Sequence, residues 1–246
     1  MHNIDLDSVG LKNLERTIDY KLENIYSFNF DKYFGENEFD ESSKIEAVVA
    51  LSGGVDSSFS LILAKKLGFN PVAVTVDPGT IILPNQFKKN IKVLIESLEV
   101  KHEYIEADYS DIIGESFTGN VHPCGRCSKN TGQLVKQYAK DNEIPIIIFG
   151  DMLATGSQCI NLQEDSLYRL NLPASLSVGK QEIKSLIRNY DLQTFKGFGC
   201  PLLYEVHKKF PHMRKFSIQR ILRETRSGAL EPGEALDLIW SFNKVK

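Results

Sequence analysis

Seven consecutive residues combine small, flexible and hydroxyl-bearing side chains in the order Ser-Gly-Gly-Val-Asp-Ser-Ser. They follow a short β-branched run and precede a helical pattern, so we expect them to join a strand to a helix. Glycines let a backbone approach a ligand closely, and the N–H groups at a helix N-terminus attract anions. A carboxylate beside phosphates suits Mg²⁺. The turn alone is equally compatible with a capped Gly-Gly turn that binds nothing. The candidate phosphate-binding residues are Ser52, Gly53, Gly54, Val55, Asp56, Ser57 and Ser58.

Cysteine spacing indicates a second candidate site. Cys124 and Cys127 form a CxxC pair, and Cys200 precedes a proline far along the chain. Thiolates at this spacing can hold one metal ion or cluster, and a third cysteine from another loop would close the site. Structural zinc, a redox-active pair and simple packing are the alternatives. We interpret Cys159 as a buried, inert thiol. The candidate fourth ligands of a zinc ion are His122, His207 and His212.

Composition limits the class of protein that carries these sites. The chain has 246 residues, of which 42% are hydrophobic and 25% charged, as expected for one soluble globular domain. No apolar run approaches the roughly 20 residues of a membrane helix, and the first residues do not resemble a secretory signal. Four cysteines are too few for a disulfide scaffold, so we expect reduced thiols in a cytoplasmic protein.

Charge is distributed unevenly about the formal net charge of −3. Residues 1–44 carry ten acidic and five basic side chains, whereas residues 180–226 carry four acidic and eleven basic ones. A local basic segment points to a polyanionic partner, and a solvated helix face is the alternative. We expect the neighbouring aromatic residues Phe210, Phe216 and Trp240 in the core. The candidate nucleic-acid-binding residues are Arg214, Lys215, Arg220, Arg223 and Arg226.

Alternating strand and helix patterns provide the framework for these residues. We expect strands at 45–51, 71–76, 102–107 and 145–149, with helices at 56–67, 85–98 and 126–141 between them. This alternation predicts an α/β fold with a doubly wound, mostly parallel sheet that binds ligands at the carboxyl ends of its strands. The expected flanking elements are an amphipathic helix at 1–28, an acidic linker at 35–44, and helices at 180–189, 212–226 and 231–242.

The glycine–serine loop and three later motifs resemble the PP-loop (N-type) ATP pyrophosphatases. Val-Thr-Val-Asp at 74–77 matches the stretch where that family holds adenine and ribose, and 150–156 resembles its second ATP-facing loop. Leu-Pro-Ala at 172–174 and Lys-Gln-Glu-Ile from Lys180 resemble its P-L and K-x-E-I stretches. The resemblance covers residues 45–205 and implies an enzyme that cleaves ATP to AMP and pyrophosphate. The further nucleotide contacts that it implies are Val76, Asp77, Gly150, Asp151, Thr155 and Gly156.

Within that superfamily, a CxxC pair with a distant Cys-Pro is similar to the tRNA thiolases of the 2-thiocytidine, 2-thiouridine and archaeal 4-thiouridine types. The resemblance implies a [4Fe-4S] cluster on the three cysteines with one iron left open, a magnesium ion on Asp56, and sulfur replacing an adenylated carbonyl oxygen. The thiolases continue their second loop with a histidine and two aspartates, which residues 156–161 lack, so Asp151 is the candidate substitute. The candidate catalytic residues are Asp56, Asp151, Cys124, Cys127 and Cys200.

These inferences divide the chain into three expected segments. They are an N-terminal helix with an acidic linker at 1–44, an ATP-binding catalytic domain at 45–205 and a basic helical extension at 206–246. The expected partners are tRNA, a sulfide source or sulfur-carrier protein, and a second copy of the chain. The alternatives are a sulfurtransferase acting on a small cofactor precursor, a zinc-containing PP-loop amidotransferase or ligase, and a non-catalytic nucleotide-binding regulator.

Overall fold

The computed structural model describes residues 8–37, 39, 45–163, 166–193, 197 and 199–242. The start of the expected N-terminal helix (1–7), most of the acidic linker (38 and 40–44) and Lys196 of the basic segment lie outside these residues.

The described strands form one six-stranded sheet in the order β3-β2-β1-β4-β6-β5. All neighbours are parallel except β5, which runs antiparallel to β6. The order reverses beside β1, with β2 on one side and β4 on the other, so the carboxyl ends of β1 and β4 flank a topological switch point. The α/β prediction is therefore confirmed. The strands are β1 (Glu46–Ala50), β2 (Asn70–Asp77), β3 (Lys101–Glu106), β4 (Ile146–Phe149), β5 (Ile160–Leu162) and β6 (Tyr168–Asn171).

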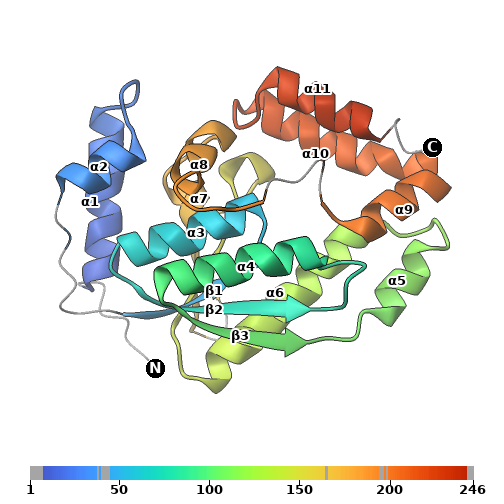
Figure 1. Cartoon of the computed structure of the whole chain (residues 1–246), viewed down its shortest axis with the longest axis horizontal. Helices are drawn as coiled ribbons and strands as arrows, with labels where there is room; N and C mark the ends of the chain where they lie inside the picture. Colours follow the sequence, from blue (N-terminus) through green and yellow to red (C-terminus); the bar gives the residue numbers. More distant parts are fainter. Residues whose placement is uncertain are drawn as a thin grey trace.

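Helices cover both faces of the sheet (Figure 1). On one face, α3 (Val55–Lys66) and α4 (Asn85–Leu98) share a hydrophobic cluster with Val49 and other inward-facing residues of the strands. On the other, α6 (Pro123–Asp141) packs Val135 against Val48. Adjacent strand residues thus face opposite sides, and both sides are apolar because both are covered. The continuous β-branched runs in the sequence follow from this burial.

The N-terminal segment is divided into two helices instead of the one expected. The first, α1 (Val9–Glu23), ends where the Asn24 N–H bonds to two preceding carbonyl groups. The second, α2 (Phe30–Glu36), is capped by the Asn29 side chain, which accepts from the Lys32 N–H at 2.9 Å. The Asn24 side chain bonds to the Tyr20 carbonyl at the end of α1, whereas Asn29 caps the start of α2. Both helices pack on the sheet domain through Leu14 and Phe30.

The carboxyl edge of the sheet faces α9, α10 and α11 (Figure 1). The α10–α11 pair has its own cluster around Ile221 and Phe242. Phe216 and Trp240 are 43% and 51% exposed, so the prediction that they are core residues is wrong, because they lie on the outer faces of their helices. Among the described residues, no helix is both long and apolar enough to cross a membrane. The remaining helices are α5 (Ser110–Ser116), α7 (Leu172–Ser175), α8 (Lys180–Ile187), α9 (Pro201–Lys209), α10 (Arg214–Arg226) and α11 (Pro232–Ser241).

Candidate functional site

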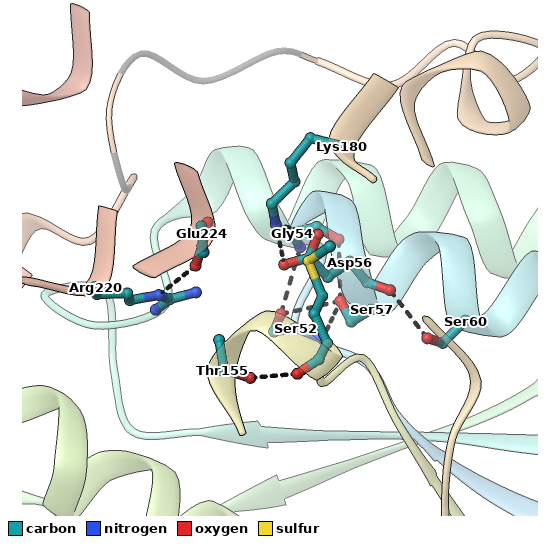
Figure 2. A network of polar contacts seen from close by, with 10 residues as sticks. Ser52, Gly54, Asp56, Ser57, Ser60, Thr155, Lys180, Arg220 and Glu224 are labelled. Atoms are coloured by element: carbon teal, nitrogen blue, oxygen red, sulfur yellow. Dashed lines mark hydrogen bonds and ion pairs between the residues drawn. The ribbon is translucent and has the colours of Figure 1, made fainter. Parts of the chain in front are cut away.

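The glycine–serine loop joins β1 to α3 at the switch point and is braced by its own hydroxyl groups (Figure 2). The Ser57 Oγ accepts from the Ser52 N–H at 3.1 Å and donates to the Gly54 carbonyl at 3.0 Å. The Ser52 Oγ lies 3.0 Å from the Ser57 Oγ. Ser58, by contrast, is fully buried. The loop is therefore shaped by bonds within itself, and the first turn of α3 presents its backbone N–H groups at the sheet edge.

Two glycines allow close contacts around this loop. Gly53 has φ of 72°, and a Cβ there would lie 2.4 Å from the Phe87 carbonyl oxygen of α4. Gly150 ends β4, and its Cβ would lie 2.8 Å from the Asp56 carbonyl carbon and 2.9 Å from the Ser57 nitrogen. Real Cβ atoms do not approach backbone so closely. Glycine at 150 thus brings the end of β4 directly against the first turn of α3.

Asp56 is held by a lysine 124 residues away in the chain. The Lys180 Nζ lies 2.6 Å from both carboxylate oxygens of Asp56, and the two side chains are only 14% and 25% exposed. Lys180 begins α8, whose Glu182 side chain caps the Gly179 N–H at 2.9 Å. Lys180 was not among the predicted site residues, although its K-x-E-I motif was recognised. The motif could therefore have identified this lysine.

The loops after β2 and β4 contribute the other predicted nucleotide contacts. Asp77 ends β2, where it accepts from the Gly79 N–H at 3.0 Å and pairs with Lys88. Asp151 pairs with Arg169 of β6, a residue that the sequence analysis did not select. Thr155, in the 3₁₀ helix η1 (Leu153–Thr155), donates to the Met152 carbonyl at 2.7 Å. Val76 is buried within β2, and Gly156 closes η1 with φ of 84°.

Figure 2 draws Thr155, Ser52, Asp56 and Lys180 together, from three separate stretches of the chain. All lie beyond the carboxyl ends of β1 and β4 or on helices that approach them. The structure thus brings the loop, its lysine and η1 to the edge of the sheet that the sequence predicted.

The three predicted cysteine ligands come from the N-termini of two helices. Cys124 and Cys127 lie within α6, which begins at Pro123. We expected this helix to begin at residue 126, but proline favours the first helical position and starts α6 earlier, at Pro123. Cys200 is the N-cap of α9. Two residues later, the Leu202 N–H donates to the Ile81 carbonyl, which joins the start of α9 to the loop after β2.

Each of these thiols is harder to ionise than an ordinary cysteine. Cys124 is an exposed residue, yet desolvation of its thiol, followed by the effect of the Cys200 thiol, raises its pKa to about 11, and Arg220 opposes the change. Burial, followed by Cys124 and Cys200, raises the pKa of Cys127 to about 12. Burial also raises the pKa of Cys200. A helix N-terminus alone would lower these values, so burial and the mutual effect of the thiols outweigh the helix.

The donor chemistry of this group suits a thiophilic metal or an iron–sulfur cluster. Cys200 acts electrostatically on Cys124, both act on Cys127, and each thiol would exchange its proton for a metal ion on binding. Within the part of the chain that the structure describes, no group of three or more His, Cys, Asp or Glu side chains is arranged to hold a metal ion.

The remaining candidate ligands are engaged in hydrogen bonds elsewhere. The Nε2 atoms of His122 and His207 lie 3.3 and 3.2 Å from the Ser217 Oγ, and the Nε2 of His212 lies 2.9 Å from the Gly119 oxygen. Cys159 is only partly buried, and its Sγ contacts the Ala174 carbonyl at 3.5 Å. These contacts are those of structural side chains.

The basic residues of α10 fall into two groups. Arg214 donates its Nε to the His207 carbonyl at 3.1 Å, and Arg220 donates its Nε to Glu224 at 2.9 Å. Lys215 lies over the ring of Phe216 at 5.1 Å, on the exposed side of the helix with Arg223 and Arg226. The sequence put all five on one candidate surface, but Arg214 and Arg220 bond to groups of the protein itself, although the Arg220 side chain stays 45% exposed.

Comparison with known proteins places this geometry in a family. Residues 46–160 match the family model described as queuosine biosynthesis protein QueC. The chain is 36% identical over 203 residues to uncharacterized protein MJ1638 of Methanocaldococcus jannaschii, an alignment that covers 81% of this chain and 76% of that protein.

Two further relatives have names that describe a reaction. The tRNA-specific 2-thiouridylase MnmA of Persephonella marina is 26% identical over an alignment of 190 residues, and the alignment covers 60% of this chain and about half (52%) of the thiouridylase. The structure of the U34-tRNA thiolase NcsA of Methanococcus maripaludis, with its [4Fe-4S] cluster, aligns with a TM-score of 0.50. That alignment covers 96% of this chain and 78% of NcsA at 14% identity, which demonstrates a shared fold.

Proposed function

Because this chain belongs to the PP-loop superfamily of ATP-utilising enzymes, in one family with MJ1638, we propose that it is an ATP-dependent sulfurtransferase that thiolates tRNA. The observation that carries the proposal is the placement of two features at one edge of the sheet. These are a phosphate-type loop around Asp56 and three thiols at the N-termini of α6 and α9. The tRNA acceptor is supported by the names of the MnmA and NcsA relatives.

The first step activates the oxygen that is to be replaced. The carbonyl oxygen of the base attacks the α-phosphorus of ATP, an O–P bond forms, and the bond to the β-phosphate breaks to release pyrophosphate. The ring N–H proton passes to solvent water at the same time, so the base becomes an adenylated imidate. Backbone N–H groups of residues 53–57 would bind the departing pyrophosphate, where preorganised donors lower the barrier.

Asp56 and Lys180 would bind opposite charges of MgATP, the carboxylate binding Mg²⁺ and the ammonium group binding phosphate. In the described structure they neutralise each other at 2.6 Å. Bound MgATP offers each a better partner, because Mg²⁺ prefers carboxylate oxygen and phosphate prefers ammonium. The ion pair therefore keeps both side chains in place until the nucleotide separates them.

The second step replaces the activated oxygen. Hydrosulfide from a sulfide source or carrier attacks the imidate carbon, the C–S bond forms, and AMP leaves with the electron pair of the C–O bond. The proton of the hydrosulfide moves to the ring nitrogen, which restores the neutral base with C=S in place of C=O. Cys124, Cys127 and Cys200 would hold a [4Fe-4S] cluster, which supplies an iron able to bind sulfide.

The outward-facing residues Lys215, Arg223 and Arg226 would contact the tRNA backbone. Contacts of this kind position a nucleic acid without reading its sequence, and their strength falls with salt. The exposed Phe216 ring contacts the ring of His122, which lies two residues before Cys124. An aromatic ring in that position could stack on an unpaired base.

The test is a reconstituted reaction under anaerobic conditions. Unmodified tRNA, MgATP and ³⁵S-labelled sulfide are mixed with the enzyme, and the nucleosides are separated after digestion. The proposal predicts tRNA-dependent release of AMP and pyrophosphate together with ³⁵S in one nucleoside. Asp56→Asn should lose AMP release, and Cys124→Ala should lose incorporation of the label, whereas Cys159→Ala should retain both.

Two outcomes would contradict this function. AMP release that depends on ammonia and not on sulfide would identify an amide-forming ligase. AMP release with sulfide but without tRNA would identify a small-molecule sulfurtransferase.

A further inference from the structure

Arg220 belongs to the basic segment that the sequence assigns to nucleic acid, yet it faces a different way from Lys215 and Arg223. Its helix, α10, packs beside η1 of the second ATP-facing loop. Figure 2 draws its side chain extending from α10 toward the side where Asp56 and Thr155 lie. Residue 220 is therefore directed at the proposed catalytic edge.

A buried carboxylate fixes the orientation of this arginine. Glu224, one turn further along α10, is 5% exposed and accepts from the Arg220 Nε at 2.9 Å. A charge-assisted bond to a buried partner limits the directions in which the guanidinium can point. The Arg220 side chain remains 45% exposed, so solvent, and hence a ligand, can reach it.

The same end of α10 is tied by backbone bonds to the lysine that holds Asp56. The Ala229 N–H donates to the Glu224 carbonyl at 2.9 Å, and the Ala229 carbonyl accepts from the Lys180 N–H at 2.8 Å. Lys180 then reaches Asp56. A continuous series of bonds thus holds Arg220 in a fixed position relative to the phosphate loop.

The groups that affect the pKa of Arg220 include one from the phosphate loop and one of the candidate cluster ligands. After the opposing effect of burial, Glu224 is the largest influence on the arginine pKa and raises it, and Asp56 and Cys124 raise it further. The guanidinium is therefore close enough to be affected by the loop that would bind pyrophosphate and by Cys124, which would hold the cluster. The α-phosphate of ATP is the group expected between the phosphate loop and the cysteines, because it is bonded first to pyrophosphate and then to the substrate oxygen.

We propose that Arg220 is a catalytic residue that binds the α-phosphate of ATP and, after pyrophosphate leaves, the phosphate of the adenylated substrate. This inference rests on the proposed function and gives Arg220 a role other than contact with the tRNA backbone. A guanidinium presents several N–H donors in one plane and can bind two phosphate oxygens at once. It would stabilise the charge that develops on AMP as the C–O bond breaks.

The test uses different ligands to distinguish contacts with the α-phosphate from contacts with the pyrophosphate. Calorimetric titrations with AMP, with α,β-methylene ATP and with inorganic pyrophosphate are made in the presence of Mg²⁺. Arg220→Gln should weaken binding of AMP and of the analogue at least tenfold, as expected for loss of a charged hydrogen bond, and change pyrophosphate binding less than about twofold. Arg220→Lys keeps the charge without the planar fork, so it should fall between wild type and Arg220→Gln.

Matched variants establish what each result means. Arg188→Gln makes the same chemical change at an exposed arginine where α8 ends, and it should leave all three affinities unchanged. Lys180→Met should show the converse pattern, weakening the binding of pyrophosphate more than the binding of AMP. Thermal unfolding of each variant verifies that the fold is retained.

Three results would overturn the inference. Arg220→Gln could leave AMP affinity intact, weaken AMP and pyrophosphate equally, or weaken only tRNA binding. In each case the wild-type enzyme still binds ATP, and the proposed function stands. If wild-type enzyme binds no adenine nucleotide at all, the proposed function fails and this inference fails with it.

Discussion

Gly150→Ala tests whether close contact between β4 and the phosphate loop is essential to the site. The added Cβ would lie 2.8 to 2.9 Å from three backbone atoms of Asp56 and Ser57, about 0.5 Å or more inside an ordinary contact. Neither neighbour is a flexible side chain, so the strand end or the first turn of α3 must move. Overpacking of this kind costs about 1–3 kcal/mol of unfolding free energy.

The movement would fall on Asp56 and Ser57 themselves, so nucleotide binding should suffer as well as stability. We expect the affinity for α,β-methylene ATP to fall about tenfold, since misplaced donors lose charged hydrogen bonds. Urea unfolding gives the stability and calorimetry gives the affinity. Gly132→Ala is the matched control, because that glycine lies within α6 with nothing near its Cβ position, and it should stabilise the protein by about 0.5–1 kcal/mol. A Gly150→Ala protein as stable as wild type, with unchanged affinity, would refute this reasoning.

Three further predictions concern charge. Lys180→Met leaves the partly buried Asp56 carboxylate without its partner and should cost about 2 kcal/mol of unfolding free energy, part of which the double variant with Asp56→Asn should recover in urea titrations. Burial lowers the pKa of His207 to about 4. Between pH 6.5 and 4 the unfolded chain therefore binds a proton at this residue and the folded chain does not. The free energy of unfolding should fall by up to about 3 kcal/mol as the pH decreases over that range. His207→Gln should flatten that pH profile, and an unchanged profile would refute the assignment. Replacing Lys215, Arg223 and Arg226 with glutamine should reduce the slope of log affinity for tRNA against log salt by about 2, and an unchanged slope would remove these residues from the interface.

The framework of the fold was accessible from the sequence because its long elements carry clear periodicity. The helix expected at 85–98 is α4 (Asn85–Leu98), and the loop after residue 51 begins α3 at Val55. By contrast, β5 and β6 have three and four residues, too few for a period to be visible. The unexpected helix α9 begins at a proline after glycine-rich sequence, where turn signals hide a helix start.

The sequence identified the types of residue at the candidate site better than their contacts. Lys180 and Arg220 lie within motifs or runs that were recognised, but their directions depend on packing between segments far apart in the chain. The ion pair between Asp56 and Lys180 spans 124 residues, and no local pattern encodes it. Similarly, the direction of the Arg220 side chain, which differs from that of Lys215 and Arg223, depends on its bond to Glu224, whose burial follows from the packing of α10.

The most direct test of the account is the iron and acid-labile sulfide content of the anaerobically purified protein. The central claim is that Cys124, Cys127 and Cys200 serve one metal site beside the ATP loop. It predicts about four irons and four sulfides per chain, lost when any one of the three cysteines is replaced by alanine and retained in Cys159→Ala. Stoichiometric zinc without iron, or a metal content that the cysteine variants leave unchanged, would contradict it.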